Sequence, residues 1–168
     1  MHMNFINKLY TNYNQKKEHN IYCLTRDDIH SCDTTNVLTR SINTAQQTIF
    51  ACVYKFTNNK IVNVLEDALN RGIKIMLIMD YKNNHSSQIV DNLRELGADI
   101  MFWNKHEKLH AKFVIIDNTI VLTGSFNWTV SKRHKVDLII SLFDTNSIMN
   151  FHSLFNELKD NITTSTQS

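Results

Sequence analysis

One stretch in the second half of the chain combines side chains that could carry out chemistry together. His110 and Lys112 lie two residues apart, Asp117 follows five residues later, and Ser125 and Asn127 form a second pair two residues apart. In an extended chain, side chains two residues apart point to the same side. A hairpin between the two pairs would bring an imidazole, an ammonium, a hydroxyl and an amide into one small volume.

This set of groups suits the hydrolysis of a phosphodiester. The Lys112 ammonium and the Asn127 amide can hold non-bridging oxygens and stabilise charge that develops in the transition state. A neutral His110 can attack phosphorus and form a covalent intermediate, and a second histidine must then protonate the leaving oxygen. No cluster of carboxylates accompanies these residues, so the sequence does not indicate a two-metal mechanism. No cofactor is expected.

The first two thirds of the chain alternate between two patterns. Apolar residues at helical spacing predict helices, and short apolar runs predict buried strands. Three helices are expected: one at 34–47 with Asp33 as its N-cap, one that begins after the N-cap Thr57 and ends at Gly72, and one at 86–96. The expected strands are 48–54, 73–79 and 98–102. Strands that alternate with helices indicate an α/β sheet covered on both faces.

The remainder of the chain is expected to add a hairpin, a strand and a closing helix. The hairpin joins strands 111–116 and 120–122 through a turn at 117–119, the strand covers 136–143 and the helix covers 144–158. One domain of residues 31–160 is expected, after a flexible arm of residues 1–30 and before a disordered tail of residues 161–168.

Composition constrains the function only weakly. The 168 residues carry a formal charge of +2, which neither indicates nor excludes a nucleic-acid partner. Three cysteines and no visible signal peptide or transmembrane segment favour reduced thiols and a cytoplasmic location. His19, Cys23, His30 and Cys32 form a weak candidate zinc set, because their spacing is irregular; ordinary thiols and surface histidines are the expected alternative.

The motif His110-x-Lys112-x4-Asp117, followed by Gly124-Ser125-x-Asn127, resembles the signature of the phospholipase D superfamily. The wider sequence looks like its small single-motif branch, which includes Nuc-type endonucleases and the Zucchini and mitochondrial cardiolipin hydrolase proteins. The segments that carry this likeness are 54–57, Arg71-Gly72 before a strand that ends in Asp80, and 123–129. The likeness covers about residues 36–161 and implies a mixed β-sheet flanked by helices on both faces.

The resemblance also implies a homodimer with the active site at the interface. One His110 would attack and His110 of the partner subunit would act as the acid, while Lys112 and Asn127 grip phosphate and Ser125 supports the site without a metal. The family usually carries a glutamate after the asparagine, which orients the nucleophile. Here Asp137 is the carboxylate available to take that role.

Three functions remain open from sequence. A basic and aromatic rim favours an endonuclease-type phosphodiesterase on single-stranded DNA or RNA, in which Lys108 and Trp128 would bind substrate. The rim comprises Trp103, Lys105, Lys108, Trp128, Lys132, Arg133 and Lys135. His106 and His134 flank the site in sequence and could touch substrate, but exposed loop histidines are the favoured interpretation. A solvated surface with core tryptophans is the competing interpretation. The second function is a phospholipid hydrolase of the cardiolipin type, and the third is a catalytically weakened nucleic-acid-binding module.

Overall fold

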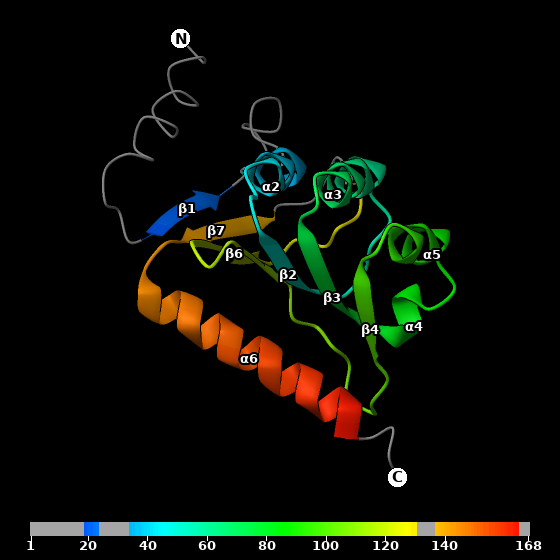
Figure 1. The fold of residues 1–168 in the computed structure, drawn as a ribbon. Coiled ribbons are helices and arrows are strands. Elements are labelled where there is room, and N and C mark those ends of the chain that lie inside the picture. The colour runs from blue at the N-terminus through cyan, green and yellow to red at the C-terminus, as the bar shows by residue number, and fades with distance from the viewer. Residues whose placement is uncertain (1–18, 24–33, 131–136, 165–168) are drawn as a thin grey trace.

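A computed structural model describes residues 19–23, 34–130 and 137–164, with only the backbone described for 19–23. Its centre is a seven-stranded mixed sheet with the order β1-β7-β6-β5-β2-β3-β4 (Figure 1). The strands are β1 (His19–Cys23), β2 (Thr48–Val53), β3 (Lys74–Asp80), β4 (Asp99–Trp103), β5 (Phe113–Ile116), β6 (Ile120–Gly124) and β7 (Leu138–Leu142). The helices are α2 (Thr34–Asn43), α3 (Asn59–Asn70), α4 (Tyr81–Asn84), α5 (Gln88–Glu95) and α6 (Thr145–Thr163).

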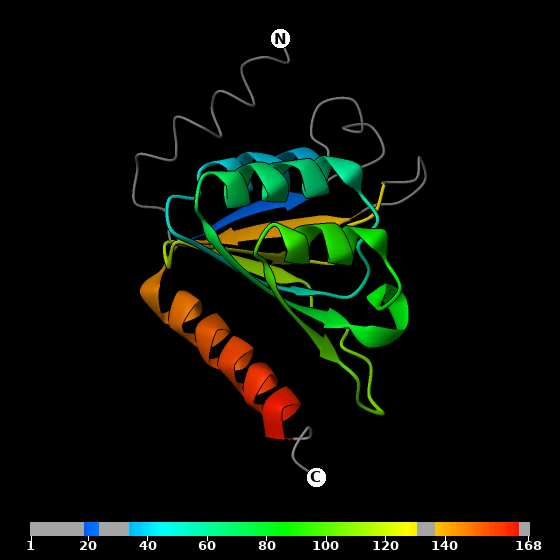
Figure 2. The same ribbon diagram turned by 45° about the vertical axis from the view of Figure 1, so that its right-hand side comes forward.

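Helices cover both faces of the sheet, as the strand–helix alternation predicts. Helices α2, α3 and α5 lie on one face and the long helix α6 crosses the other (Figures 1 and 2). The strands contribute side chains to two separate cores, one on each face of the sheet, because alternate side chains of a strand point to opposite faces. In β2, for example, Ile49 and Ala51 belong to the core under α2 and α3, whereas Cys52 belongs to the core over α6.

Two kinds of pairing divide the sheet. Strands β2, β3 and β4 are parallel neighbours and are connected by helices, as parallel strands require. Strands β5, β6 and β7 run antiparallel to their neighbours, and β5 and β6 form the expected hairpin. Strand β1 pairs antiparallel with β7 at the edge of the sheet. Residues 19–23 therefore correct the prediction of a flexible arm, while 1–18 and 24–30 lie outside the described residues.

Several element boundaries differ from the sequence prediction. Helix α2 ends at Asn43 rather than at residue 47, and α3 takes Asn58 as its N-cap instead of Thr57. The Asn58 side chain accepts a hydrogen bond from the Lys60 amide, which satisfies a donor of the first turn. Helix α6 continues past Leu158 to Thr163 because Ile162 still packs against the core, so residues 161–163 are not a disordered tail.

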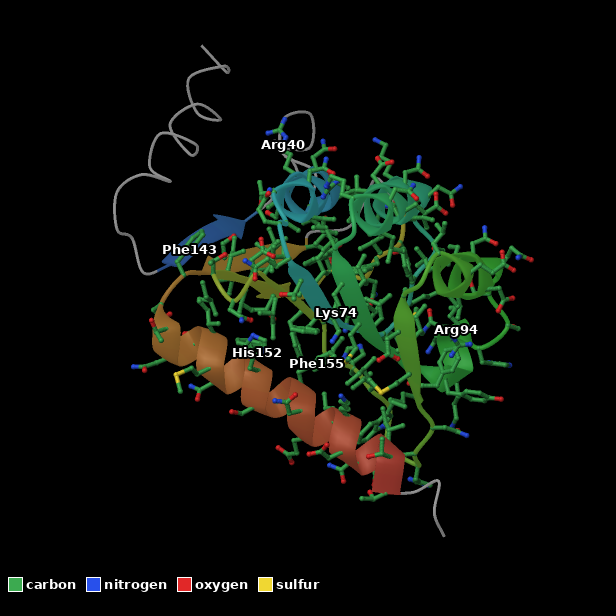
Figure 3. All side chains as sticks on the ribbon, in the orientation of Figure 1. Arg40, Lys74, Arg94, Phe143, His152 and Phe155 are labelled. Atoms are coloured by element: carbon green, nitrogen blue, oxygen red, sulfur yellow. The ribbon has the colours of Figure 1, made fainter. Side chains whose placement is uncertain are left out.

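Helix α6 lays an aromatic and apolar face against the sheet. Figure 3 shows His152 and Phe155 pointing from the helix toward the strands. The ring of Phe50 in β2 lies 5.5 Å from that of Phe155 and 5.6 Å from that of His152, measured between centroids. The Nε2 atom of His152 is also hydrogen-bonded to Oδ1 of Asn118 in the β5–β6 turn. An imidazole thus joins the helix to the hairpin.

The position of His152 predicts a pH dependence of stability. Burial lowers the pKa of its imidazole below the ordinary value, so the unfolded chain binds the proton more readily than the folded one. This contribution to the free energy of unfolding is therefore fully present above about pH 6.5 and is lost as the pH falls below that value. Urea unfolding at pH 8 and pH 5 measures how much the free energy of unfolding falls between the two values. This fall should be larger for the native chain than for His152→Gln. Equal losses in the two proteins would contradict this assignment.

The candidate zinc set cannot be assembled from the described residues. His30 and Cys32 lie outside them, and only the backbone of His19 and Cys23 is described, so this set stays a prediction. Among the described side chains no group of three or more histidine, cysteine or acidic residues could hold a metal ion. The thiol of Cys52 lies in the core, and burial raises its pKa well above the usual range.

Candidate active site

The elements that carry the motif residues meet at one edge of the sheet. The pairing of the strands places the carboxyl ends of β2, β3, β4 and β6 there, together with the amino ends of β5 and β7. We refer to this edge as the carboxyl edge. Open α/β sheets generally bind their ligands outside the carboxyl ends of their parallel strands.

His110 and Lys112 come together at this edge on the segment that leads into β5. The Nζ atom of Lys112 donates a hydrogen bond of 2.7 Å to the carbonyl oxygen of His110 and lies 5.2 Å from the centre of the Tyr54 ring. The imidazole of His110 meets the same ring edge to face, with 4.8 Å between centroids. Lys112 is buried, with 7% of its surface exposed, whereas His110 is open to solvent. A single tyrosine thus contacts both the candidate nucleophile and the candidate phosphate-binding cation.

Two buried polar side chains hold Tyr54 and His110 in place. Asn84 in α4 donates to the Tyr54 carbonyl (2.9 Å) and accepts from the Phe56 amide (3.1 Å). Asp80, at the end of β3, accepts from the Leu109 amide at 3.3 Å, immediately before His110. Only 3% of Asp80 and 2% of Asn84 is exposed. Buried polar groups of this kind fix the backbone because losing a partner in the interior is costly.

The contacts of Tyr54 predict a role in positioning. Tyr54→Leu removes the ring that lies against His110 and Lys112, and we expect the turnover number for a phosphodiester to fall about tenfold or more, because small displacements of reacting groups are expensive. Tyr54→Phe keeps the ring and is the matched control, with turnover near that of the native protein. Equal losses in the two variants would show that the hydroxyl, not the ring, is what the site needs.

Asp117 lies at the opposite end of β5 from the nucleophile. It lies five positions beyond Lys112, or roughly 17 Å along an extended strand. Its carboxylate accepts hydrogen bonds from the main-chain amides of Gln46 (2.7 Å), Gln47 (2.8 Å) and Thr48 (2.8 Å). These bonds hold the chain extended as it enters β2, which explains why α2 ends early. Asp117 is therefore a structural member of the motif and does not reach the site.

The Asp117 contacts predict a large effect on stability. Asp117→Ala removes a charged acceptor from three amides and places alanine at a backbone φ of +51°, so we expect the free energy of unfolding to fall by about 2–3 kcal/mol. Asp117→Asn retains an acceptor and tolerates this φ, and should lose less. Urea titration measures both values, and an unchanged midpoint for Asp117→Ala would contradict the assignment.

The segment after β6 closes the other side of the site. Thr123 donates its hydroxyl to the Lys112 carbonyl (2.9 Å), and the Trp128 carbonyl accepts from the amides of Thr57 (2.8 Å) and Asn58 (3.1 Å). The intervening residues therefore span the gap between Lys112 and the end of β2. Asn127 lies on this span, half-buried, and its Oδ1 atom is buried with no hydrogen-bond partner among the residues that the structure describes.

Asp137 is placed beside Ser125. The Ser125 hydroxyl donates to Oδ1 of Asp137 (3.2 Å) and accepts from the Leu138 amide (2.9 Å). Within the described part of the chain, the carboxylate makes no hydrogen bond to His110. Ser125 therefore supports the start of β7, and the orientation of His110 by Asp137 stays a prediction.

The structure corrects part of the predicted rim. Trp128 is only 1% exposed and packs edge to face on Phe56 with 5.1 Å between ring centroids, so it belongs to the core and does not bind substrate. Trp103 is half-buried and its indole donates to the Glu107 carbonyl. Lys108 and His106 are exposed at the carboxyl edge, and Lys105 is half-buried nearby. The other rim residues, Lys132, Arg133 and Lys135, lie outside the described residues, and so does the flanking His134.

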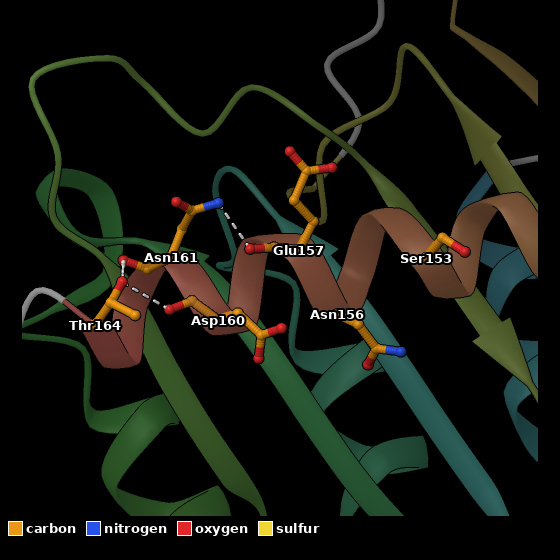
Figure 4. A pocket seen from close by; sticks show the side chains of 6 residues that line it. All are labelled: Ser153, Asn156, Glu157, Asp160, Asn161 and Thr164. Carbon is orange, nitrogen blue, oxygen red and sulfur yellow. Dashed lines mark hydrogen bonds between the residues drawn. The ribbon is translucent and has the colours of Figure 1, made fainter.

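A concave surface lies along one polar side of α6. Figure 4 shows its lining, which comprises Ser153, Asn156, Glu157, Asp160, Asn161 and Thr164. All six residues come from α6 and its C-cap Thr164, and none is a histidine, cysteine or basic group. The charged groups of this lining are the carboxylates of Glu157 and Asp160, and it holds no cation that could bind a phosphate, so the carboxyl edge is the candidate active site.

Comparison with known proteins assigns a family to this arrangement. A family model described as the phospholipase D-like domain of cardiolipin synthase matches residues 38–159. The chain belongs to the phospholipase D-like family of phosphodiesterases. None of the described helices in this phospholipase D-like domain has both the length and the apolar character needed to cross a bilayer.

Relatives of the phospholipase D-like domain carry several names. A mitochondrial cardiolipin hydrolase of Chlamydomonas reinhardtii is 30% identical over 123 residues, covering 71% of this chain and 54% of that protein. A phospholipase D of Rickettsia conorii is 29% identical over 134 residues, covering 75% and 67%. The chain thus spans about half the length of the algal relative.

Solved structures share the fold. NucT from Helicobacter pylori superposes with a TM-score of 0.75 at 22% identity, over 84% of this chain and 95% of that one. Nuc from Salmonella typhimurium, a phospholipase D family member, gives a TM-score of 0.73 at 19% identity, over 85% and 95%. These similarities establish the architecture of the phospholipase D-like domain.

Proposed function

We propose that this chain is a homodimeric endonuclease that hydrolyses phosphodiester bonds in single-stranded nucleic acid through a phosphohistidine intermediate. A neutral His110 attacks phosphorus, the bond to the leaving oxygen breaks, and His110 of the partner subunit donates a proton to that oxygen. Water then attacks the phosphohistidine and gives its proton back to the same partner histidine. The proton that His110 of the partner subunit gives up in the first step returns to it in the second, so no further acid or base is needed.

The contact of His110 and Lys112 with one tyrosine ring is the observation that carries the phosphodiesterase proposal. It places an exposed imidazole and a buried ammonium against the same ring, at 4.8 Å and 5.2 Å from its centre, and a buried cation stabilises a developing phosphorane charge strongly. The Oδ1 atom of Asn127 is buried without a partner among the described residues. A phosphodiester oxygen has no hydrogen to donate, so a donor on the partner subunit or on a part of the substrate outside the phosphate would have to satisfy this acceptor.

The charge at the carboxyl edge supports a polyanionic substrate. Lys55 after β2, Lys82 in α4 and Lys108 before β5 are all exposed there. Glu107 is an exposed acid in the same region, and Asp80 is buried and committed to the backbone. Cations outnumber exposed acids among the described residues of this edge, which favours binding to a phosphate backbone.

A phospholipid hydrolase is the second candidate, because the curated relatives named above are a cardiolipin hydrolase and a phospholipase D. The two candidates share the same nucleophile and the same cleaved bond. They differ in what surrounds the phosphate, which is a chain of nucleotides in one case and a diacylglycerol in the other.

A substrate panel tests the proposal. Purified protein is incubated in EDTA with labelled single-stranded DNA, single-stranded RNA and cardiolipin vesicles, with His110→Asn as the inactive control. We expect cleavage of at least one single strand and none by the variant. Release of phosphatidic acid without strand cleavage would favour the lipid candidate. Strand binding without any hydrolysis would indicate a nucleic-acid-binding module and would refute the enzyme.

A further inference from the structure

A row of aromatic and cationic side chains runs from α5 across β4 to the short helix α4. The Arg94 guanidinium lies 5.0 Å from the centre of the Phe102 ring. Phe102 meets Tyr81 edge to face, with 5.7 Å between centroids and 88° between planes. Tyr81 in turn stacks on His85, with 4.4 Å between centroids and 18° between planes. We call these four residues the stacked row.

Hydrogen bonds fix both ends of the stacked row. The Nδ1 atom of His85 is bonded to the Tyr81 carbonyl at 2.8 Å, and Arg94 donates through Nη2 to the Ile100 carbonyl at 2.8 Å. His85 and Arg94 are exposed, whereas Tyr81 and Phe102 are half-buried. Tyr81 stacks on one face of the imidazole, and because His85 is exposed, a ligand that stacks on the other face would extend the row. Because the rings are already ordered, binding on them costs little additional conformational entropy.

The stacked row lies close to the candidate nucleophile. Tyr81 directly follows Asp80, whose carboxylate accepts from the Leu109 amide, and Leu109 directly precedes His110. Figure 2 shows α4 just beyond the end of β3, at the carboxyl edge. Lys82 adds an exposed cation on the same short helix. A nucleic-acid strand with one phosphate at His110 would reach the row within a few nucleotides.

We propose that the stacked row is a binding platform for the bases of single-stranded nucleic acid, with His85 as its outermost ring. The row is not needed to cleave a phosphodiester, so this inference deepens the proposed function by identifying what recognises the substrate. Flat rings bind bases of any sequence by stacking. The acyl chains and glycerol of a phospholipid offer no planar group to such a surface, so the row favours nucleic acid over lipid.

Binding of strands with and without bases tests this proposal. A labelled twelve-nucleotide deoxythymidylate and an abasic strand of the same length are titrated against full-length His110→Asn protein, which leaves the strands uncut. Adding His85→Ala should weaken binding of the base-bearing strand about tenfold and leave the abasic strand unchanged. Adding His85→Phe should restore stacking, and Ser86→Ala is the matched exposed control, expected to change neither affinity.

Three results would overturn the proposal. They are unchanged binding of the base-bearing strand to His85→Ala, an equal loss for both strands, and a loss of affinity for cardiolipin vesicles alone. Failure of the proposed function would appear separately, as an absence of cleavage of labelled single strands by the native chain. The binding experiment does not depend on that reaction, so the two failures are distinguishable.

Discussion

His110→Asn should reduce the hydrolysis of a small phosphodiester on the order of 10⁴-fold or more while leaving the fold intact. The large effect follows because asparagine cannot form the covalent intermediate, and loss of a nucleophile typically removes most of the catalysis. The fold should survive because the side chain is exposed and its one described ring contact is with Tyr54. Initial rates and a thermal melt measure the two effects.

Trapping provides a positive control for the same variant. A labelled substrate quenched in denaturant should leave a covalent adduct on the native chain and none on His110→Asn. Hydrolysis with no adduct at any quench time would contradict a phosphohistidine, even if the variant were inactive.

Mixing the same variant with native chain tests the homodimer. If each reaction uses one His110 from each subunit, mixed dimers are inactive. In an equilibrated one-to-one mixture, activity per native chain should then fall to roughly half, because half of the native chains are paired with a variant. Independent active sites would leave activity per native chain unchanged.

Gly124→Ala should destabilise the protein by about 3–5 kcal/mol, among the largest effects of a single methyl group. A Cβ atom at this position would lie 1.9 Å from the Leu138 carbonyl oxygen and 2.8 Å from its carbon. Both atoms belong to the backbone of β7, so no side chain can move aside. Relief of the clash requires β6 and β7 to separate where Ser125 and Asp137 meet, so residual folded protein should also lose activity.

Gly97→Ala is the matched control for that substitution. Gly97 also has a positive φ, of +100°, but a Cβ atom there would have no neighbour within 4 Å. Its free energy of unfolding should fall only by the cost of the backbone strain, roughly 1–2 kcal/mol. Urea unfolding of the two variants separates strain from collision, and equal losses would contradict the close approach at Gly124.

The chemical motif and the order of the elements could be predicted because both are local in the sequence. The spacing of His110 and Lys112 and the apolar periodicity are legible without knowledge of distant contacts. The burial of Trp128 could not be predicted from the sequence, because tryptophan is common both in exposed stacking sites and in protein cores. Its place is decided by Phe56, more than seventy residues away, and by the main-chain bonds beside that residue.

The features missed by sequence reasoning share a physical origin. Helix α4 has four residues, too few to show an apolar period, yet it holds Asn84 and Tyr81. Thr57 and Asn58 are both good N-cap residues, so propensity alone cannot choose between them. The hydrogen bonds of Asp80 and Asn84 join groups about thirty residues apart in the sequence, and the local sequence does not indicate such partners.

Asp80 and Asn84 connect the two parts of the site to the same short helix. Both side chains bracket the single turn of α4, one capping its start and the other forming its last residue. Through them the strand end that carries Tyr54 and the loop that carries His110 are tied to the same turn. Unwinding that turn would release both at once, so the nucleophile and the ring beside it form one cooperative unit of local opening. Order at the reacting centre is thus set by the stability of four residues that take no part in the chemistry.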